Sequence, residues 1–203
     1  MKKWFVSAKK ADFTEIGKKF DITPMTARII RNRDVVGDEQ IRKYLQGSTA
    51  DLYSPWDLSG MREGTALLQQ TILNGEKIRI IGDYDIDGVC ATYILLTGLK
   101  KIGANVDTVI PDRIKDGYGI NEHLIDGAKE DGVQVIVTCD NGIAAGSQIA
   151  YAKELGMKVI VTDHHEVPFE EKENGRVEKL PPADVIINPK QEGCHYPWKG
   201  LCG

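Results

Sequence analysis

Two patterns of apolar and polar positions divide the chain. From about residue 12 to 46, apolar residues recur at helical spacing, and Thr23-Pro24 is typical of an N-cap and first helical position. Asp38 is a candidate N-cap for a further helix. A turn-rich connector at 54–60 leads to an expected helix from Arg62 to Leu73. We therefore expect a small helical region, with its connector, over residues 1–60.

From residue 61 to 203 the pattern changes, because short apolar runs alternate with helix-like segments. The runs predict strands at Ile78–Ile81, Val106–Ile110, Val133–Cys139, Lys158–Thr162 and Asp184–Ile187. The segments between them predict helices at Val89–Lys101, Glu122–Glu130 and Ala144–Leu155. Buried β-branched runs that alternate with helices indicate an α/β fold, with an open and mostly parallel sheet of about five strands flanked by helices, Rossmann-like in arrangement. The charged residues 166–183 are expected to form an irregular surface loop.

Three of the expected strands end in polar clusters. These are Gly82-Asp83-Tyr84-Asp85-Ile86-Asp87-Gly88, Asp140-Asn141-Gly142 and Asp163-His164-His165-Glu166. Ligands of open parallel sheets bind outside the carboxyl ends of the strands. The fold therefore brings together five side chains that are distant in sequence: Asp85, Asp87, Asp140, His164 and His165.

Each cluster alone has a plainer explanation. The first resembles the start of a calcium loop, but no Glu follows at the spacing that such a loop requires. An Asp between a strand and a helix is an ordinary N-cap, and Asp140-Asn141-Gly142 is a common turn. Together, carboxylates and imidazoles without thiolates favour Mn²⁺ or Mg²⁺. Two such ions about 3.5–4 Å apart would neutralise the crowded carboxylates, activate a water and clamp a phosphate.

These three motifs resemble those of the DHH phosphoesterase superfamily. Within it, the chain is most similar to the bacterial single-strand-specific DNA exonucleases. That closer similarity rests on Tyr84, Pro111-Asp112-Arg113, Asp116-Gly117-Tyr118-Gly119, Ser54-Pro55-Trp56 and Gly200-Leu201-Cys202-Gly203. The resemblance runs from about residue 50 to the end, and residues 12–46 fit more loosely.

The resemblance implies roles for the residues of the clusters. The implied metal ligands are Asp85, Asp87, Asp140 and His164, with Asp140 bridging two ions. His165 would lie beside the scissile phosphate and stabilise its developing charge. Asp163 would orient ligands or helix starts, and Asp83 would either do the same or bind metal directly.

Substrate contacts are expected on the loop that follows the second strand. Arg113 and Lys115 lie at the same sheet edge as the metal cluster and could pair with phosphates. Tyr118 could stack on a terminal base. A solvated loop and a simple turn explain these three residues equally well.

The implied activity is Mn²⁺- or Mg²⁺-dependent hydrolysis of single-stranded DNA from its 5′ end, in repair and recombination, with a helicase or single-strand-binding protein as partner. Two alternatives stay open: a DHH phosphodiesterase acting on oligonucleotides or cyclic dinucleotides, and a non-catalytic scaffold that binds single strands. The family carries a further metal-binding Asp beyond Asp163-His164-His165. No candidate follows here, so we expect residues 61–203 to be a DHH domain truncated before that last motif, and we expect the chain alone to be less than fully active.

Charge at first argues against a nucleic-acid partner, because 26 Lys and Arg face 30 Asp and Glu. The first 50 residues, however, hold 11 basic and 6 acidic side chains, and much of the acidic excess beyond them lies in the proposed metal cluster. DNA is therefore not excluded.

No apolar run of 18 residues occurs, the N-terminus does not resemble a secretion signal, and the four cysteines form no C-x-x-C pair. We expect no membrane association, reduced thiols, packed Cys90 and Cys139, and a cytoplasmic location.

Overall fold

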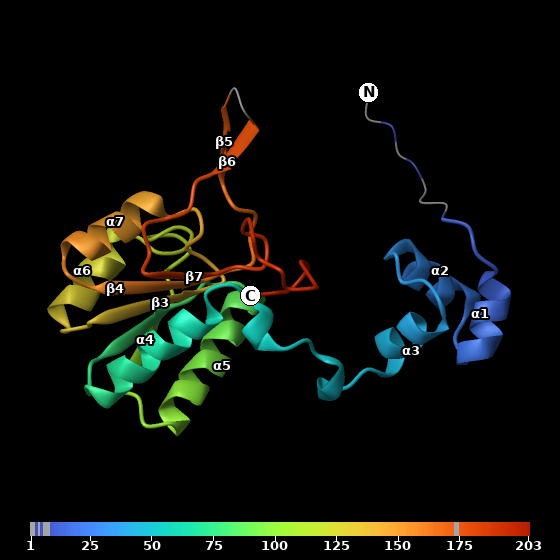
Figure 1. The fold of residues 1–203 in the computed structure, drawn as a ribbon, viewed down its shortest axis with the longest axis horizontal. Helices are drawn as coiled ribbons and strands as arrows, with labels where there is room; N and C mark the ends of the chain where they lie inside the picture. Colours follow the sequence, from blue (N-terminus) through green and yellow to red (C-terminus); the bar gives the residue numbers. More distant parts are fainter. Residues whose placement is uncertain (1–2, 4, 6–8, 173–174) are drawn as a thin grey trace. The chain divides into compact units, whose positions relative to one another are not determined.

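The computed structural model describes residues 3, 5, 9–172 and 175–203 (Figure 1). The chain divides into two compact units, Met1–Leu52 and Tyr53–Gly203. The described part of the first unit is helical, and the second is built on a parallel sheet. Within the described residues, none of the helices has both the length and the apolar character needed to cross a bilayer.

The described part of the first unit contains three short helices and a 3-10 turn. The helices are α1 (Phe13–Phe20), α2 (Pro24–Asn32) and α3 (Asp38–Gln46), followed by the turn η1 (Thr49–Asp51). The Thr23 hydroxyl accepts from the N–H of Thr26 at 3.1 Å, as expected of an N-cap. Asp38 is the first residue of α3 rather than its cap, because Gly37 takes the cap position with φ 84°, which glycine adopts without strain.

The second unit contains a five-stranded sheet with strand order β2-β1-β3-β4-β7. The strands are β1 (Ile78–Ile81), β2 (Val106–Val109), β3 (Val135–Cys139), β4 (Lys158–Thr162) and β7 (Val185–Ile187). All four pairings are parallel, and Cys139 lies beside Thr162 where β3 and β4 end. The predicted α/β fold is therefore confirmed, and every strand ends at the same edge.

Helices cover both faces of the sheet (Figure 1). They are α4 (Met61–Leu73) and α5 (Ile86–Lys101) on one face, and α6 (Glu122–Glu130) and α7 (Gly146–Glu154) on the other, with the turn η2 (Pro55–Asp57) before α4. Alternate strand residues feed two cores: Ile80 packs under α4 and α5, and Ile136 under α6 and α7. Both are fully buried, and burial of one such side chain contributes about 2–3 kcal/mol. The sheet is thus a rigid platform for the residues at its carboxyl edge.

The segment predicted to be an irregular surface loop contains an antiparallel hairpin, so the prediction of irregular structure was wrong, although the hairpin is exposed as expected. Its strands are β5 (Phe169–Lys172) and β6 (Gly175–Glu178). Most of its side chains are exposed, so the sequence lacks the alternation that identifies a strand with one buried face. Contacts within the hairpin stabilise it instead. The Arg176 guanidinium lies 4.2 Å from the Phe169 ring centroid, and Nε of Arg176 lies 3.0 Å from Oε1 of Glu171.

Helix α5 begins at Ile86, three residues earlier than predicted. The helix therefore includes Asp87 in its first turn. Cys90 is exposed on this helix, so the expectation that Cys90 is packed was wrong, whereas Cys139 is buried on β3.

Candidate metal centre

The three polar clusters meet at the carboxyl edge of the adjacent strands β1, β3 and β4. Two overlapping groups of candidate ligands form there, and within each group the ligand atoms lie within 4.8 Å of one another. One group is Asp83, Asp85 and Asp140, and the other is Asp140, His164 and His165. Asp140 belongs to both, so a single carboxylate connects the aspartates beyond β1 with the histidines beyond β4.

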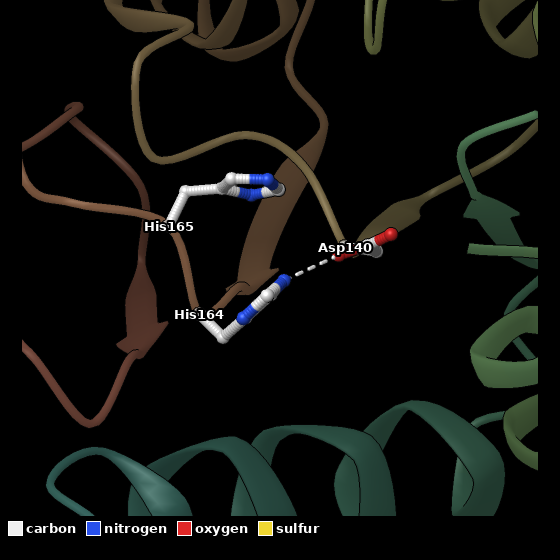
Figure 2. A group of neighbouring side chains, drawn as sticks. All are labelled: Asp140, His164 and His165. Carbon is white, nitrogen blue, oxygen red and sulfur yellow. Dashed lines mark ion pairs between the residues drawn. The ribbon is translucent and has the colours of Figure 1, made fainter. Parts of the chain in front are cut away.

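Asp140 is held in a conformation that few residues adopt. Its φ of 62° lies in the left-handed region, which Asp and Asn tolerate better than other non-glycine residues. Its N–H donates to the carbonyl of Thr162 at 3.1 Å, and the residue is 2% exposed. His164 Nε2 lies 2.9 Å from Oδ1 of Asp140 (Figure 2). No donor within the described structure is aligned with that oxygen for a hydrogen bond, although it is buried.

The start of α5 supplies two further carboxylates. Asp85 is the N-cap of α5, because its Oδ1 accepts from the N–H of Gly88 at 2.9 Å. The plain N-cap explanation therefore holds for Asp85, and its carboxylate lies in a ligand group as well. Oδ2 of Asp87 lies 3.6 Å from His164 Nε2 and accepts from the N–H of Gly203 at 2.9 Å. Asp87 thus lies beside the ligand groups, although it is in neither of them.

Asp83 is buried where β1 approaches α5. A Cβ at Gly88 would lie 2.6 Å from the Cβ of Asp83, so this close approach requires glycine. Asp83 is 1% exposed, and its Oδ1 has no hydrogen-bond partner in the described structure. A buried carboxylate oxygen without a partner is costly, and a bound cation would remove that cost.

The carboxylate of Asp163 is used by neighbouring groups. Its Oδ2 accepts from the N–H of Ile143 at 3.0 Å, and its Oδ1 accepts from the N–H of His164 at 2.7 Å. Oδ1 also lies 2.7 Å from Nδ1 of His165. Asp163 therefore fixes the backbone of its own motif and the imidazole of His165, the arrangement that orients a histidine in many metal sites.

Asn141 holds the site together, although its sequence position indicated only a common turn and membership of a family motif. Its Nδ2 donates at 3.0 Å to the carbonyls of Ile81 and Cys139, the last residues of β1 and β3. Its Oδ1 accepts from the N–H of Ile120 at 3.3 Å, and the residue is fully buried. One amide thus joins two strand ends to the loop that precedes α6. Its place directly after Asp140 was the only sequence signal for this role.

The loop after β2 reaches the metal centre through Tyr118. The Tyr118 hydroxyl donates to the carbonyl of Asp140 at 3.0 Å and lies 3.5 Å from Nδ1 of His165. Burial, followed by the nearby carboxylates of Asp163, Asp83 and Asp140, raises the pKa of Tyr118, so its proton is retained at neutral pH. The guanidinium of Arg113 lies 5.1 Å from the ring centroid of Tyr84, which contacts Tyr118 edge to face at 6.4 Å.

Lys115 stands apart from this aromatic group. Its side chain is exposed, and its backbone N–H donates to Oδ1 of Asp112 at 3.0 Å. Within the described structure, Tyr118 of this loop contacts the ligand groups directly, and Arg113 reaches them through Tyr84. Lys115 makes neither kind of contact.

The electrostatics at this edge are those of a cation site. Burial and then the negative charge of Asp87 raise the pKa of Asp140 to about 6, with opposing contributions from His164 and His165. In the described structure, neither Lys nor Arg forms an ion pair with any carboxylate of the motifs, which are Asp83, Asp85, Asp87, Asp140 and Asp163. Buried oxygens without partners and a set of oxygen and nitrogen donors without thiolates fit Mn²⁺ or Mg²⁺.

Comparison with known proteins identifies the family to which the residues of this site belong. The model of the DHH family, N-terminal domain, matches residues 77–203. The single-stranded-DNA-specific exonuclease RecJ of Bacillus subtilis is 44% identical over 186 residues, which are 92% of this chain and 22% of that protein. RecJ of Escherichia coli K12 is 34% identical over 185 residues, which are 90% of this chain and 30% of that protein.

Solved structures resemble the chain in the same way. An exonuclease RecJ bound to manganese aligns with a TM-score of 0.60 and 33% identity, over 70% of this chain and 34% of that one. RecJ of Thermus thermophilus in complex with Mn²⁺ aligns with a TM-score of 0.59 and 28% identity, over 87% of this chain and 23% of that one. The chain spans 22% of the length of the first of these curated relatives and 30% of the second. With more than half of its residues matched by the family model, the chain belongs to the DHH family.

Proposed function

We propose that this chain carries the metal centre of a nuclease that hydrolyses phosphodiester bonds of single-stranded DNA from the 5′ end, in repair and recombination. The observation that supports this most is the pair of ligand groups that share Asp140 at the sheet edge. The RecJ relatives and the manganese-bound RecJ structures support the same activity. A bound Mn²⁺ or Mg²⁺ would lower the pKa of a coordinated water and neutralise charge on the phosphate.

The side chains of the site have distinct proposed roles. We assign metal binding to Asp85, Asp87, Asp140 and His164, with Asp83 as a further ligand because its buried Oδ1 lacks a partner. His165 is proposed to stabilise the developing charge on the phosphate, since Asp163 fixes its ring through Nδ1. Tyr118 and Arg113 are proposed DNA contacts that the structure joins to the site, whereas Lys115 is a proposed phosphate contact from the exposed loop.

A direct test compares two substrates in the presence of Mn²⁺. In a protein that carries this chain together with the family's further metal-binding Asp, we expect 5′-labelled single-stranded DNA to be bound and shortened, and Asp140→Asn to abolish cleavage while circular dichroism stays unchanged. Preferential turnover of a cyclic dinucleotide would instead favour a phosphodiesterase of the same family. Binding of single strands without cleavage by that longer protein, under any metal condition, would favour a scaffold.

A protein partner follows from the proposed substrate. A nuclease restricted to single strands depends on another protein to open duplex DNA or to present the opened strand. We therefore propose a helicase or a single-strand-binding protein as partner, working in the compartment that holds the DNA, the cytoplasm. Stimulation of cleavage on a duplex by a purified helicase would test this, and an unchanged rate would contradict it.

A further inference from the structure

A cleft of about 380 Å³ opens beside the metal centre at the start of α7, a volume within the range of small-ligand pockets, about 300–1,000 Å³. Tyr118 and His165, which both contact the metal centre, line one part of it. The rest of the lining is mostly apolar or uncharged and includes Ile120, Ile143, Ala144 and Gln148.

The lining of this cleft offers no basic side chain to a phosphate. Neither Lys nor Arg is among the lining residues. Two carboxylates line it: Asp163 would repel an anion, and Glu166 is neutralised by Lys190 at 2.8 Å. The cleft therefore suits a neutral group with apolar faces and a polar edge.

Tyr118 provides this cleft with a fixed aromatic wall. The hydroxyl is tied to the carbonyl of Asp140, and the ring meets His165 edge to face, with centroids 6.1 Å apart and an interplanar angle of 88°. The ring also contacts Tyr84, yet the residue is 54% exposed. A ring held at several points loses little freedom when a flat ligand stacks on it.

We infer that this cleft is a nucleobase subsite, which holds the base of the nucleotide whose phosphate lies at the metal centre. The inference rests on the proposed function and adds the location of the base. The cleft adjoins His165 directly, so a phosphate at the ligand groups places its own nucleoside within reach. Gln148, which lines the cleft, carries an amide that can donate to or accept from the polar edge of any base.

The inference is tested by separating base binding from phosphate binding. Calorimetry with Mn²⁺ would compare a deoxynucleoside 5′-monophosphate, dTMP or dAMP, with 2-deoxyribose 5-phosphate, which lacks the base. We expect the nucleotides to bind about tenfold more tightly than the sugar phosphate, as base–aromatic stacking provides. Ala144→Phe, at an exposed lining position, should fill the cleft and reduce this preference to less than about twofold.

The matched control is Ser147→Phe, which adds the same ring to the first turn of α7 outside the lining. It should leave the preference for nucleotides unchanged. In Ala144→Phe, unchanged affinity for 2-deoxyribose 5-phosphate shows that the chain is folded and the metal centre intact.

Each remaining outcome distinguishes the inference from the proposed function. Equal affinity of the wild-type chain for nucleotide and sugar phosphate would overturn the subsite and leave the proposed function standing. An unchanged preference in Ala144→Phe would overturn the subsite in the same way. Absence of Mn²⁺-dependent binding of either ligand would overturn the proposed function, and the subsite with it.

Discussion

Carboxylates at the two ends of the same strands have different surroundings. At the amino end, the Arg79 guanidinium binds both oxygens of Asp107 at 2.7 and 2.8 Å and Asp131 at 2.7 Å, and Lys77 Nζ lies 2.9 Å from Asp107. At the carboxyl end, Asp140 and Asp83 are more deeply buried, and no Lys or Arg of the described structure pairs with them. The amino-end carboxylate of Asp107 has cationic partners in the chain, whereas Asp83 and Asp140 each keep a buried oxygen that only a cation from solution would pair.

The two ends also differ in the direction of their pKa shifts. Burial acts to raise the pKa of Asp107, but hydrogen bonds from Arg79 and Lys77 outweigh it and the pKa is lowered. The pKa of Asp140 is raised to about 6. The amino end is therefore stabilised by its charges, and the carboxyl end, without a cation, is destabilised by them. Four predictions test this contrast.

The largest effect is expected from Asp140→Asn, which keeps size and tolerance of the left-handed conformation but removes the charge that both ligand groups share. Mn²⁺ affinity measured by calorimetry should fall at least about 100-fold, in line with the loss of a central ligand. Asp107→Asn, at the opposite end, should leave Mn²⁺ affinity unchanged. Equal losses in the two variants would contradict the contrast.

Asn141→Ala is expected to weaken both the fold and the metal centre. It leaves the carbonyls of Ile81 and Cys139 and the N–H of Ile120 without their buried partner. The free energy of unfolding in urea should fall by about 2–3 kcal/mol, and Mn²⁺ affinity by about tenfold or more. A loss of stability with full Mn²⁺ affinity would show that Asn141 holds the strands but not the ligands.

The pH dependence of stability should have opposite signs at the two ends. Because the folded pKa of Asp140 is above its unfolded value, its contribution is greatest below about pH 4 and is lost as pH rises through about 6. With EDTA, the loss across this range should be about 2 kcal/mol, and Asp140→Asn should remove it. The contribution of Asp107 has the reverse sign, since it is present above pH 3.8 and is lost as pH falls through the lowered pKa.

Melting temperature measured by calorimetry at intervals of pH would resolve these contributions. Saturating Mn²⁺ should abolish the decline between pH 4 and 6, because a bound cation stabilises the ionised form of Asp140. A decline of equal size in Asp140→Asn would assign it to another group.

The smallest effect is expected for Asp107→Asn, which removes one partner of a half-buried ion pair. The free energy of unfolding should fall by about 1 kcal/mol, because Arg79 keeps Asp131 as a partner. Addition of salt should reduce the difference between the variant and the wild type. An increase in stability would show that the amino-end pairs cost more in desolvation than they return.

The sequence predicted where the metal-site motifs lie better than it predicted the hydrogen bonds that hold them in place. Asp85, Asp140 and His164 could be placed because parallel strands share a carboxyl edge, which apolar patterning alone reveals. The role of Asn141 could not, since its three hydrogen bonds join segments up to 60 residues apart. The hairpin at 169–178 was missed because its exposed charges carry no periodic apolar signal.

The conformation of Asp140 limits which amino acids the position can accept. At φ 62°, glycine and asparagine can take the place of aspartate with little backbone strain, whereas alanine or a β-branched residue cannot. In a saturation library scored separately for abundance and for activity, Gly and Asn should therefore be tolerated for folding while Asp alone supports catalysis. Substitutions at position 140 alone would then separate the requirement of the left-handed backbone, which Gly and Asn also meet, from the requirement of the chemistry, which only Asp meets.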